Sequence, residues 1–244
     1  MKALLKALLL ASLAMVIVVT QLIHEEESGF VLSPIGQVKL STELPKEPAK
    51  LPVYKVVGDE SRFVRSSNLW QPRDLPSEAE AIKLAPKLAE KYGGIPKDAK
   101  LIHVETVYLV GYNLSTKKEE ERIPMFISLV YKREIDGLPV VGPGGEINID
   151  LGNNEVLTFL KIWRKLEYVG EVKIISAEKA FEKLKRGEVV NKPVSPLKLE
   201  VIQIKPGYYA KGLGEKQEYY KPVWVFYCKD ELSNNVTLAV KAVE

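Results

Sequence analysis

Apolar and polar residues alternate along most of this chain, and two helical patterns interrupt the alternation. Between Leu101 and Tyr112 the apolar side chains fall mainly on every second position, which is the period of a strand with one buried face. The same reading predicts further strands at 53–57, 62–65, 123–133, 146–151, 156–166, 197–204, 218–228 and 235–243.

The first helical pattern lies in "LPSEAEAIKLAPKLAEKYGG". Ser77 and Glu80 have the spacing of a capping box, and the apolar residues that follow recur every three or four positions. The glycine pair at 93–94 predicts the end of the helix. Pro86 is expected to kink or shorten it, because proline lacks an N–H group and its ring crowds the preceding turn.

The second helical pattern, "SAEKAFEKLKRG", begins after Ser176 and is followed by strands in the same order as the first. "IPMFISLVYKREIDG" corresponds to "KPVWVFYCKDELSNN", with Pro124 aligned to Pro222 and Phe126 to Trp224. This internal repeat spans roughly 70–80 residues and is too long for a solenoid. It predicts an α+β protein with two tandem units, each a helix packed on an antiparallel sheet.

The N-terminus has the pattern of a membrane anchor. Residues 7–23 are seventeen uncharged positions, about 26 Å of helix against a hydrocarbon layer of about 30 Å. Lysines precede the run and three glutamates follow it, which favours a cytoplasmic N-terminus; a cleaved signal peptide is the alternative. We expect a signal-anchor transmembrane helix at 1–24, a proline-containing stalk at 25–52, and α+β units at 53–168 and 169–244.

Composition narrows the classes of partner. Apolar residues make up 46% of the chain, enough for a core, and the net charge is only +3. The basic residues form no stripe interleaved with aromatic residues, so nucleic acid is not an expected partner. The single cysteine, Cys228, lies in an apolar run and is expected to be a buried core residue.

The glycine-rich segment 142–145 raises the possibility of a phosphate-binding loop. A dinucleotide loop needs G-x-G-x-x-G between a strand and a helix, but position 147 is isoleucine and a strand follows. Pro143 also removes one N–H donor. The segment therefore favours a hairpin connection.

Acidic residues after this segment raise the possibility of carboxylate chemistry. Glu146, Asn148 and Asp150 alternate with apolar residues, which places all three on one face of a strand. A solvated sheet face explains the pattern, and a carboxylate-based enzyme using Glu146 or Asp150 is the alternative. No residue is predicted to be catalytic, to hold a cofactor or to bind a metal.

One stretch carries a family resemblance. "YKREIDGLPVVGPGGEINIDLGNNEV", at 131–156, resembles the propeptide region of thermolysin-like proteases, of the PepSY/FTP type. "ISAEKAFEKLKRGEV" is similar to the helix that opens a PepSY unit, and "YYKPVWVFYCKD" to a strand near its end. A similar tandem arrangement occurs in extracytoplasmic regulators of the YycH/YycI and YpeB kind. The resemblance covers roughly 75–244, and it implies structural roles for Gly137, Pro139, Val140, Gly142, Pro222 and Trp224.

The resemblance and the anchor pattern together predict a function. We expect a non-catalytic, membrane-anchored binding or regulatory protein at the cell membrane, with its C-terminal part outside the cytoplasm. Its partner would be another envelope protein, either a surface protease that it restrains or a signalling protein that it modulates, and no cofactor is expected. Asn113 and Asn235 stand in N-x-S/T triplets and are possible glycosylation sites. An envelope hydrolase that uses carboxylates and a structural surface spacer are the alternatives.

Overall fold

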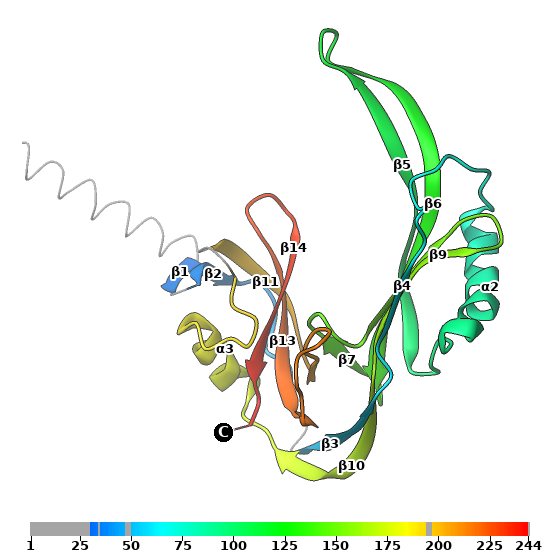
Figure 1. The fold of residues 1–244 in the computed structure, drawn as a ribbon. Helices are drawn as coiled ribbons and strands as arrows, with labels where there is room; N and C mark the ends of the chain where they lie inside the picture. The colour runs from blue at the N-terminus through cyan, green and yellow to red at the C-terminus, as the bar shows by residue number, and fades with distance from the viewer. Residues whose placement is uncertain (1–29, 34, 47–49, 194–196, 244) are drawn as a thin grey trace, which may run out of the picture.

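The computed structural model describes residues 30–33, 35–46, 50–193 and 197–243. In this part of the chain the fold is mainly β, with one mixed eleven-stranded sheet, one three-stranded sheet and two α-helices (Figure 1). The elements are β1 (Phe30–Ser33), β2 (Gly36–Leu40), β3 (Lys50–Asp59), β4 (Arg62–Arg65), α2 (Glu78–Ala89), the 3-10 turn η1 (Glu90–Tyr92), β5 (Ala99–Asn113), β6 (Lys118–Ile135), β7 (Leu138–Val141), β8 (Glu146–Leu151), β9 (Val156–Ile162), β10 (Arg164–Lys173), α3 (Ala177–Lys185), β11 (Leu197–Tyr209), β12 (Tyr219–Tyr220), β13 (Pro222–Lys229) and β14 (Asn235–Lys241).

One part of the large sheet, the N-terminal wing, consists of β4, β9, β8, β6 and β5 in that order, all antiparallel. Helix α2 covers its outer face (Figure 1). The predicted capping box is confirmed, since Ser77 and Glu80 bond each other's backbone N–H groups. The helix continues past Pro86 and buries Ala81, Ala85 and Ala89 against the sheet. These small side chains let the helix lie close to the strands.

The other part, the C-terminal wing, consists of β1, β2, β11, β13 and β14. Helix α3 covers its outer face and begins at the predicted N-cap, where Ser176 accepts a hydrogen bond from the N–H group of Lys179. The core beneath the helix includes Phe226 and the fully buried Trp224, whose indole donates to the carbonyl of Ile175 at 2.9 Å. That bond satisfies the polar atom of the buried ring.

Strand β7 joins the two wings. It pairs with the end of β6 and, in parallel, with the end of β11, where Val140 lies opposite Tyr208. The small sheet of β10, β3 and β12 runs beneath the joint (Figure 1). From there the wings diverge, with the helices on their outer sides. The buried Arg164 of β10 holds the segment before β12 by donating to the carbonyls of Lys211, Gly212 and Glu215 at 2.8–3.0 Å.

The predicted fold class, two tandem PepSY-like helix-on-sheet units, is wrong. Both wings belong to one mixed sheet, because β7 bridges them and β2 pairs in parallel with β11. The three-stranded sheet was not predicted at all, and β10 continues across the expected boundary between residues 168 and 169. Period-two alternation identifies a strand but not its neighbour, so the prediction assumed local pairing where distant strands in fact meet.

The expectation of a membrane-anchored fold at the cell membrane is also contradicted. Among the described residues no helix is both long and apolar enough to cross a membrane. The segment behind the expectation, 7–23, lies outside the described residues. Within the expected stalk, 36–40 form β2 and pair with β11.

Candidate binding cleft

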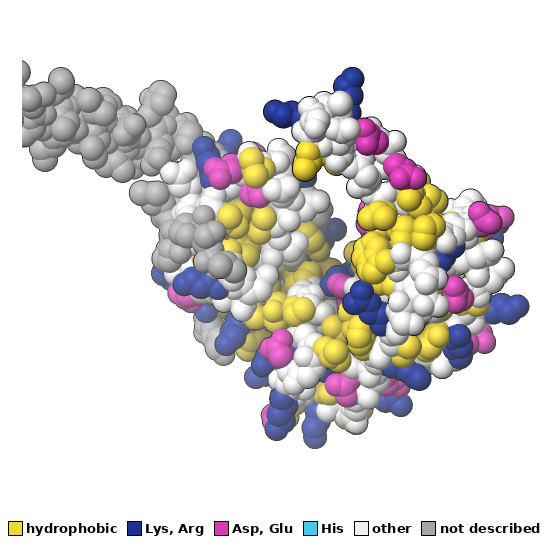
Figure 2. Space-filling view, turned by 45° about the horizontal axis from the view of Figure 1, so that its top comes forward, with side chains coloured by type: hydrophobic (Ala, Val, Ile, Leu, Met, Phe, Trp, Pro, Cys, Tyr) yellow, Lys and Arg dark blue, Asp and Glu magenta, His cyan; other side chains and the backbone are white. Residues whose placement is uncertain are grey.

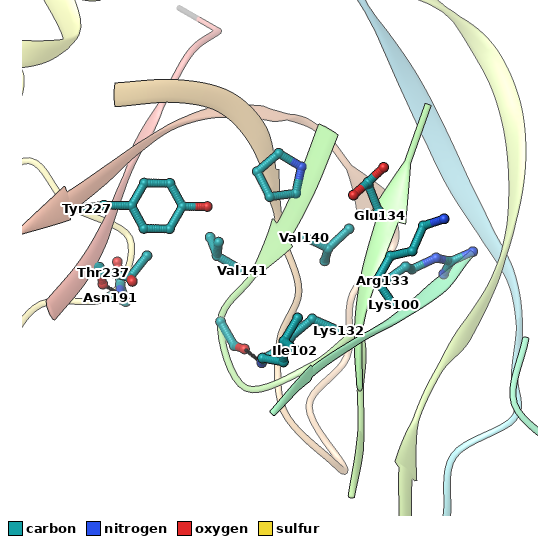
Figure 3. Close-up of a pocket in the computed structure, with 12 residues that line it drawn as sticks. Lys100, Ile102, Lys132, Arg133, Glu134, Val140, Val141, Asn191, Tyr227 and Thr237 are labelled. Carbon is teal, nitrogen blue, oxygen red and sulfur yellow. Dashed lines mark hydrogen bonds between the residues drawn. The ribbon is translucent and has the colours of Figure 1, made fainter. Parts of the chain in front are cut away.

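A cleft of about 500 Å³ lies between the wings. Figure 2 shows a hollow between the two parts of the molecule, with hydrophobic side chains along its sides. Figure 3 shows that β5 and β6 supply one wall, β7 the floor, and β13, β14 and Asn191 the other wall. The lining residues are Lys100, Ile102, Lys132, Arg133, Glu134, Pro139, Val140, Val141, Gly142, Asn191, Tyr227 and Thr237.

The wall from the N-terminal wing is charged. Lys132 forms an ion pair with Glu146 and donates to the carbonyl of Gly142 at 2.9 Å. Lys100 lies directly opposite Lys132 in the pairing of β5 with β6, and within the described residues its side chain has no hydrogen bond or ion pair. Ile102 beside it is 57% exposed. This wall therefore offers the cation of Lys100 and the anion of Glu134 next to an apolar contact.

The floor is apolar and fixed in place. Val140 packs with Tyr208, and Val141 packs with Val225 and its neighbours under the C-terminal wing. Gly142 follows at φ +95°, and a Cβ there would lie 2.6 Å from the carbonyl oxygen of Ala210. Backbone packing thus leaves no room for a side chain at the end of the floor.

The wall from the C-terminal wing is neutral and polar. Tyr227 and Thr237 face each other across β13 and β14. Burial raises the pKa of the Tyr227 phenol, so its hydroxyl stays protonated and can donate. Asn191 donates to the carbonyl of Thr237 at 2.7 Å and accepts from the N–H group of Ala239 at 2.8 Å. These bonds occupy the outer edge of β14.

The glycine-rich segment 142–145 is neither a hairpin turn nor an anion site. It connects β7 to β8, and both of these strands pair with β6 rather than with each other. The N–H group of Gly144 donates to the carbonyl of Ala210 and that of Gly145 to Ile162, so neither is directed at a ligand. The segment leaves and rejoins the edge of β6, which allows β7 to reach β11.

The acidic residues of β8 lie on the inner face of the N-terminal wing, as their alternation predicted, and the intervening Ile147 and Ile149 are fully buried beneath α2. The Asp150 carboxylate accepts a bond from the Ser128 hydroxyl at 2.9 Å, and burial raises its pKa. Glu146 and Asp150 are four residues apart on one strand, about 13 Å. Paired carboxylates in glycosidases are roughly 5–9.5 Å apart.

The other candidate groups are poorly placed for catalysis. Cys228 is buried beneath α3, as predicted, and burial raises the pKa of its thiol to about 12. His103 is exposed on β5, with its Nε2 atom 3.4 Å from the Glu105 carboxylate. No group of three metal-ligating side chains occurs in the part of the chain that the structure describes.

The residues to which the family resemblance gives structural roles, and the two possible glycosylation sites, lie in turns and strands. Asp136 and Gly137 both have positive φ in the β6–β7 turn, which is the turn that the Asp-Gly pair predicted. Asn113 ends β5 and its side-chain amide donates to Glu120, while Asn235 is exposed at the start of β14. Of the six motif residues only Pro139, Val140 and Gly142 line the cleft, and Pro222 and Trp224 lie in β13.

The remaining cleft residues were not singled out from the sequence. Lys100, Ile102, Tyr227 and Thr237 stand in ordinary strand patterns, and only the pairing through β7 brings the two walls together. No local signal marks such a site. That Lys100 lies opposite Lys132 follows only from the register of β5 with β6, which the sequence does not give.

Comparison with known proteins adds little. No family model matches the chain, so the PepSY resemblance has no support there, and no curated protein matches it. A solved structure of an uncharacterised protein from Eubacterium rectale is similar over 87% of this chain and 90% of its own, at 12% identity and a TM-score of 0.39. A similarity of that degree carries no argument about function.

Proposed function

We propose that this chain is a non-catalytic binding protein that holds an extended segment of a partner protein in the cleft between its wings. The observation that carries this proposal is the construction of the cleft from the inner sides of both wings, with β7 as an apolar floor. Ligand sites commonly combine apolar lining with a few polar groups, in volumes of roughly 300–1,000 Å³.

The unlike walls suit an extended chain. Side chains of a strand point alternately to opposite sides, so one set would face Lys100 and Glu134 and the other would face Tyr227 and Thr237. The exposed Ile102 would supply an apolar contact at the charged wall. A partner segment with an acidic residue opposite Lys100 and small or apolar residues along the rest of the cleft fits this arrangement best.

The chemistry of the inner faces supports a binding role over the carboxylate hydrolase considered above. The Glu146 carboxylate is neutralised by Lys132, and the Asp150 carboxylate accepts a hydrogen bond from Ser128. Glu146 and Asp150 are also too far apart, at about 13 Å, to act as a catalytic carboxylate pair. If the partner proves to be a protease whose activity falls on binding, the inhibitory role expected from the sequence gains support.

A photo-crosslinking amino acid at position 102 tests the proposal, with the same group at Lys83 on the exposed side of α2 as the control. We expect one discrete adduct from position 102, with the crosslinked peptide mapping to a single partner segment, and none from position 83. The partner is then purified and titrated against the wild type, Ile102→Glu and Lys83→Glu. Ile102→Glu should weaken binding about tenfold or more, because it places a charge among central contacts.

Two results would contradict the proposal. One is equal affinity of the partner for the wild type and Ile102→Glu. The other is adducts at position 102 that scatter over many proteins in the same way as those from position 83.

A further inference from the structure

A second hollow, the lysine hollow, lies on the inner face of the C-terminal wing, where β13 begins and β14 ends. Its volume is about 550 Å³. Four lysines and two tyrosines surround it, and Glu218 is the only acidic residue among its lining residues. The lysines are Lys211, Lys216, Lys221 and Lys241, and the tyrosines are Tyr209 and Tyr219.

The positive charge of the hollow is largely uncompensated. Lys216 lies 3.4 Å from Glu218 in a largely exposed ion pair, which contributes little to stability. Lys211 donates to a backbone carbonyl, and Lys221 lies over the ring of Tyr219. The side chain of Lys241 has no hydrogen bond or ion pair within the described residues. Among the described residues that line the hollow, a single carboxylate therefore faces four ammonium groups.

Two of these lysines come from adjacent strand ends. Lys241 lies opposite Val223 in the pairing of β13 with β14, and Lys221 directly precedes β13 and lines the same hollow. Like charges gathered in one hollow repel each other. An anion between Lys221 and Lys241 would relieve that repulsion.

The frame around the lysines is held before any ligand arrives. Gln217 donates to the carbonyl of Tyr209 at 2.8 Å and accepts from the N–H group of Lys211 at 2.9 Å. The buried Arg164 fixes the carbonyls of the same segment. A preorganised frame lowers the entropic cost of binding.

The hollow shares its face with the binding cleft. Tyr227 of the cleft and Val223 of the lysine hollow are both on the side of β13 that faces away from α3, four residues or about 13 Å apart. A single extended segment can span that distance with about four residues.

We infer that the lysine hollow binds a short acidic stretch of the same partner protein whose neighbouring residues occupy the cleft. This inference rests on the proposed function and names the chemistry of the partner. A polypeptide fits better than a nucleic acid because the lysines converge on one confined hollow rather than following a stripe along the surface.

The probe is fluorescein-labelled hexaglutamate, titrated into the purified full chain at about 50 mM salt, where screening is modest. We expect saturable one-to-one binding, with amide NMR shifts concentrated at Tyr219, Val223 and Lys241. The double variant Lys221→Glu/Lys241→Glu should weaken binding about tenfold or more, since paired charge reversal turns attraction into repulsion. The control Lys117→Glu/Lys118→Glu makes the same charge change at the exposed β5–β6 turn and should alter affinity less than about twofold.

Equal loss of binding in both double variants would show attraction to net charge alone and overturn the inference. Tighter binding of a single-stranded oligothymidylate or of anionic lipid vesicles, lost in Lys221→Glu/Lys241→Glu, would overturn the assignment to an acidic polypeptide. Each of these results leaves the crosslinking from position 102 unaffected, so failure of the inference is distinguishable from failure of the proposed function.

Discussion

The two wings are built alike on the outside and differ on the inside. Each packs one helix on the outer face of its strands, but the inner face of the N-terminal wing carries polar pairs such as Lys132 with Glu146 and Ser128 with Asp150. At the corresponding face of the C-terminal wing the middle is apolar, around the fully buried Val225, and the lysines gather at one end. The difference gives the cleft two unlike sides, which can fix the direction of a bound segment.

The largest effect that we expect tests whether the wings are one folding unit. Trp224→Ala removes a fully buried ring and its bond to Ile175, which should cost about 3–5 kcal/mol of the free energy of unfolding. Because β7 joins the wings, the loss should appear equally in far-ultraviolet circular dichroism and in the fluorescence of the two remaining tryptophans, Trp70 and Trp163, in the other wing. Urea unfolding of both signals measures this.

Trp70→Ala is the control for that prediction. Trp70 is 56% exposed at the N-terminal wing, where it contacts Phe126 at its edge. Its loss should cost about 1 kcal/mol, as expected for one aromatic pair. Two separate transitions in Trp224→Ala, with the fluorescence transition of Trp70 and Trp163 unchanged, would mean that the wings unfold independently.

A smaller effect is expected at the joint between the wings. A Cβ at Gly144 would lie 2.2 Å from the carbonyl oxygen of Lys211, so Gly144→Ala forces the chain segments apart. We expect a loss of about 1–3 kcal/mol, typical of overpacking. Gly58→Ala is the matched control, because the nearest atom there is 3.4 Å away on the flexible side chain of Lys165. Thermal unfolding that is equal in both variants would show that the joint is not tightly packed.

Local structure was largely predictable from the sequence. Both helix starts, at Ser77 and Ser176, follow from capping chemistry that involves only neighbouring residues. The alternation in β8 correctly separated its polar and apolar faces. The Asp136-Gly137 turn was likewise identified, because positive φ at both positions selects these residue types.

The assembly of these elements was not predictable in the same way. Strand β7 has four residues and pairs with β11, roughly 70 positions away along the chain, and no local pattern encodes that meeting. The sequence predicts a hairpin turn at the glycines of 142–145, and this prediction is wrong. These glycines are needed where the segment passes close to Ala210 and Lys211, and that contact exists only because β7 pairs with β11. The cleft depends on it too, which is why Lys100 and Tyr227 carried no signal in the sequence.

The smallest effect that we expect is a pH-dependent change in the free energy of unfolding. It has one sign for Asp150, on the inner face of the N-terminal wing, and the opposite sign for Asp230 in the C-terminal wing. Burial raises the folded-state pKa of Asp150, so the fold favours its protonated form and its charge is a penalty once the pH rises through that pKa. Asp150→Asn should therefore raise the free energy of unfolding by about 1 kcal/mol near neutral pH. The gain should vanish at pH values below the unfolded pKa, about 3.9.

Asp230, in the turn between β13 and β14, provides the opposite case. The hydrogen bond from the Asn234 side chain lowers its pKa most, and together with bonds from the backbone N–H groups of Asn234 and Leu232 it outweighs the opposing effect of desolvation. Its contribution to stability is present above the unfolded pKa and is lost as the pH falls through the folded one. Asp230→Asn should thus destabilise the chain at neutral pH and have no effect in acid. Urea unfolding of both variants between about pH 3 and pH 7 measures the two slopes, and slopes of the same sign would mean that Asp150 is not held in a desolvated site.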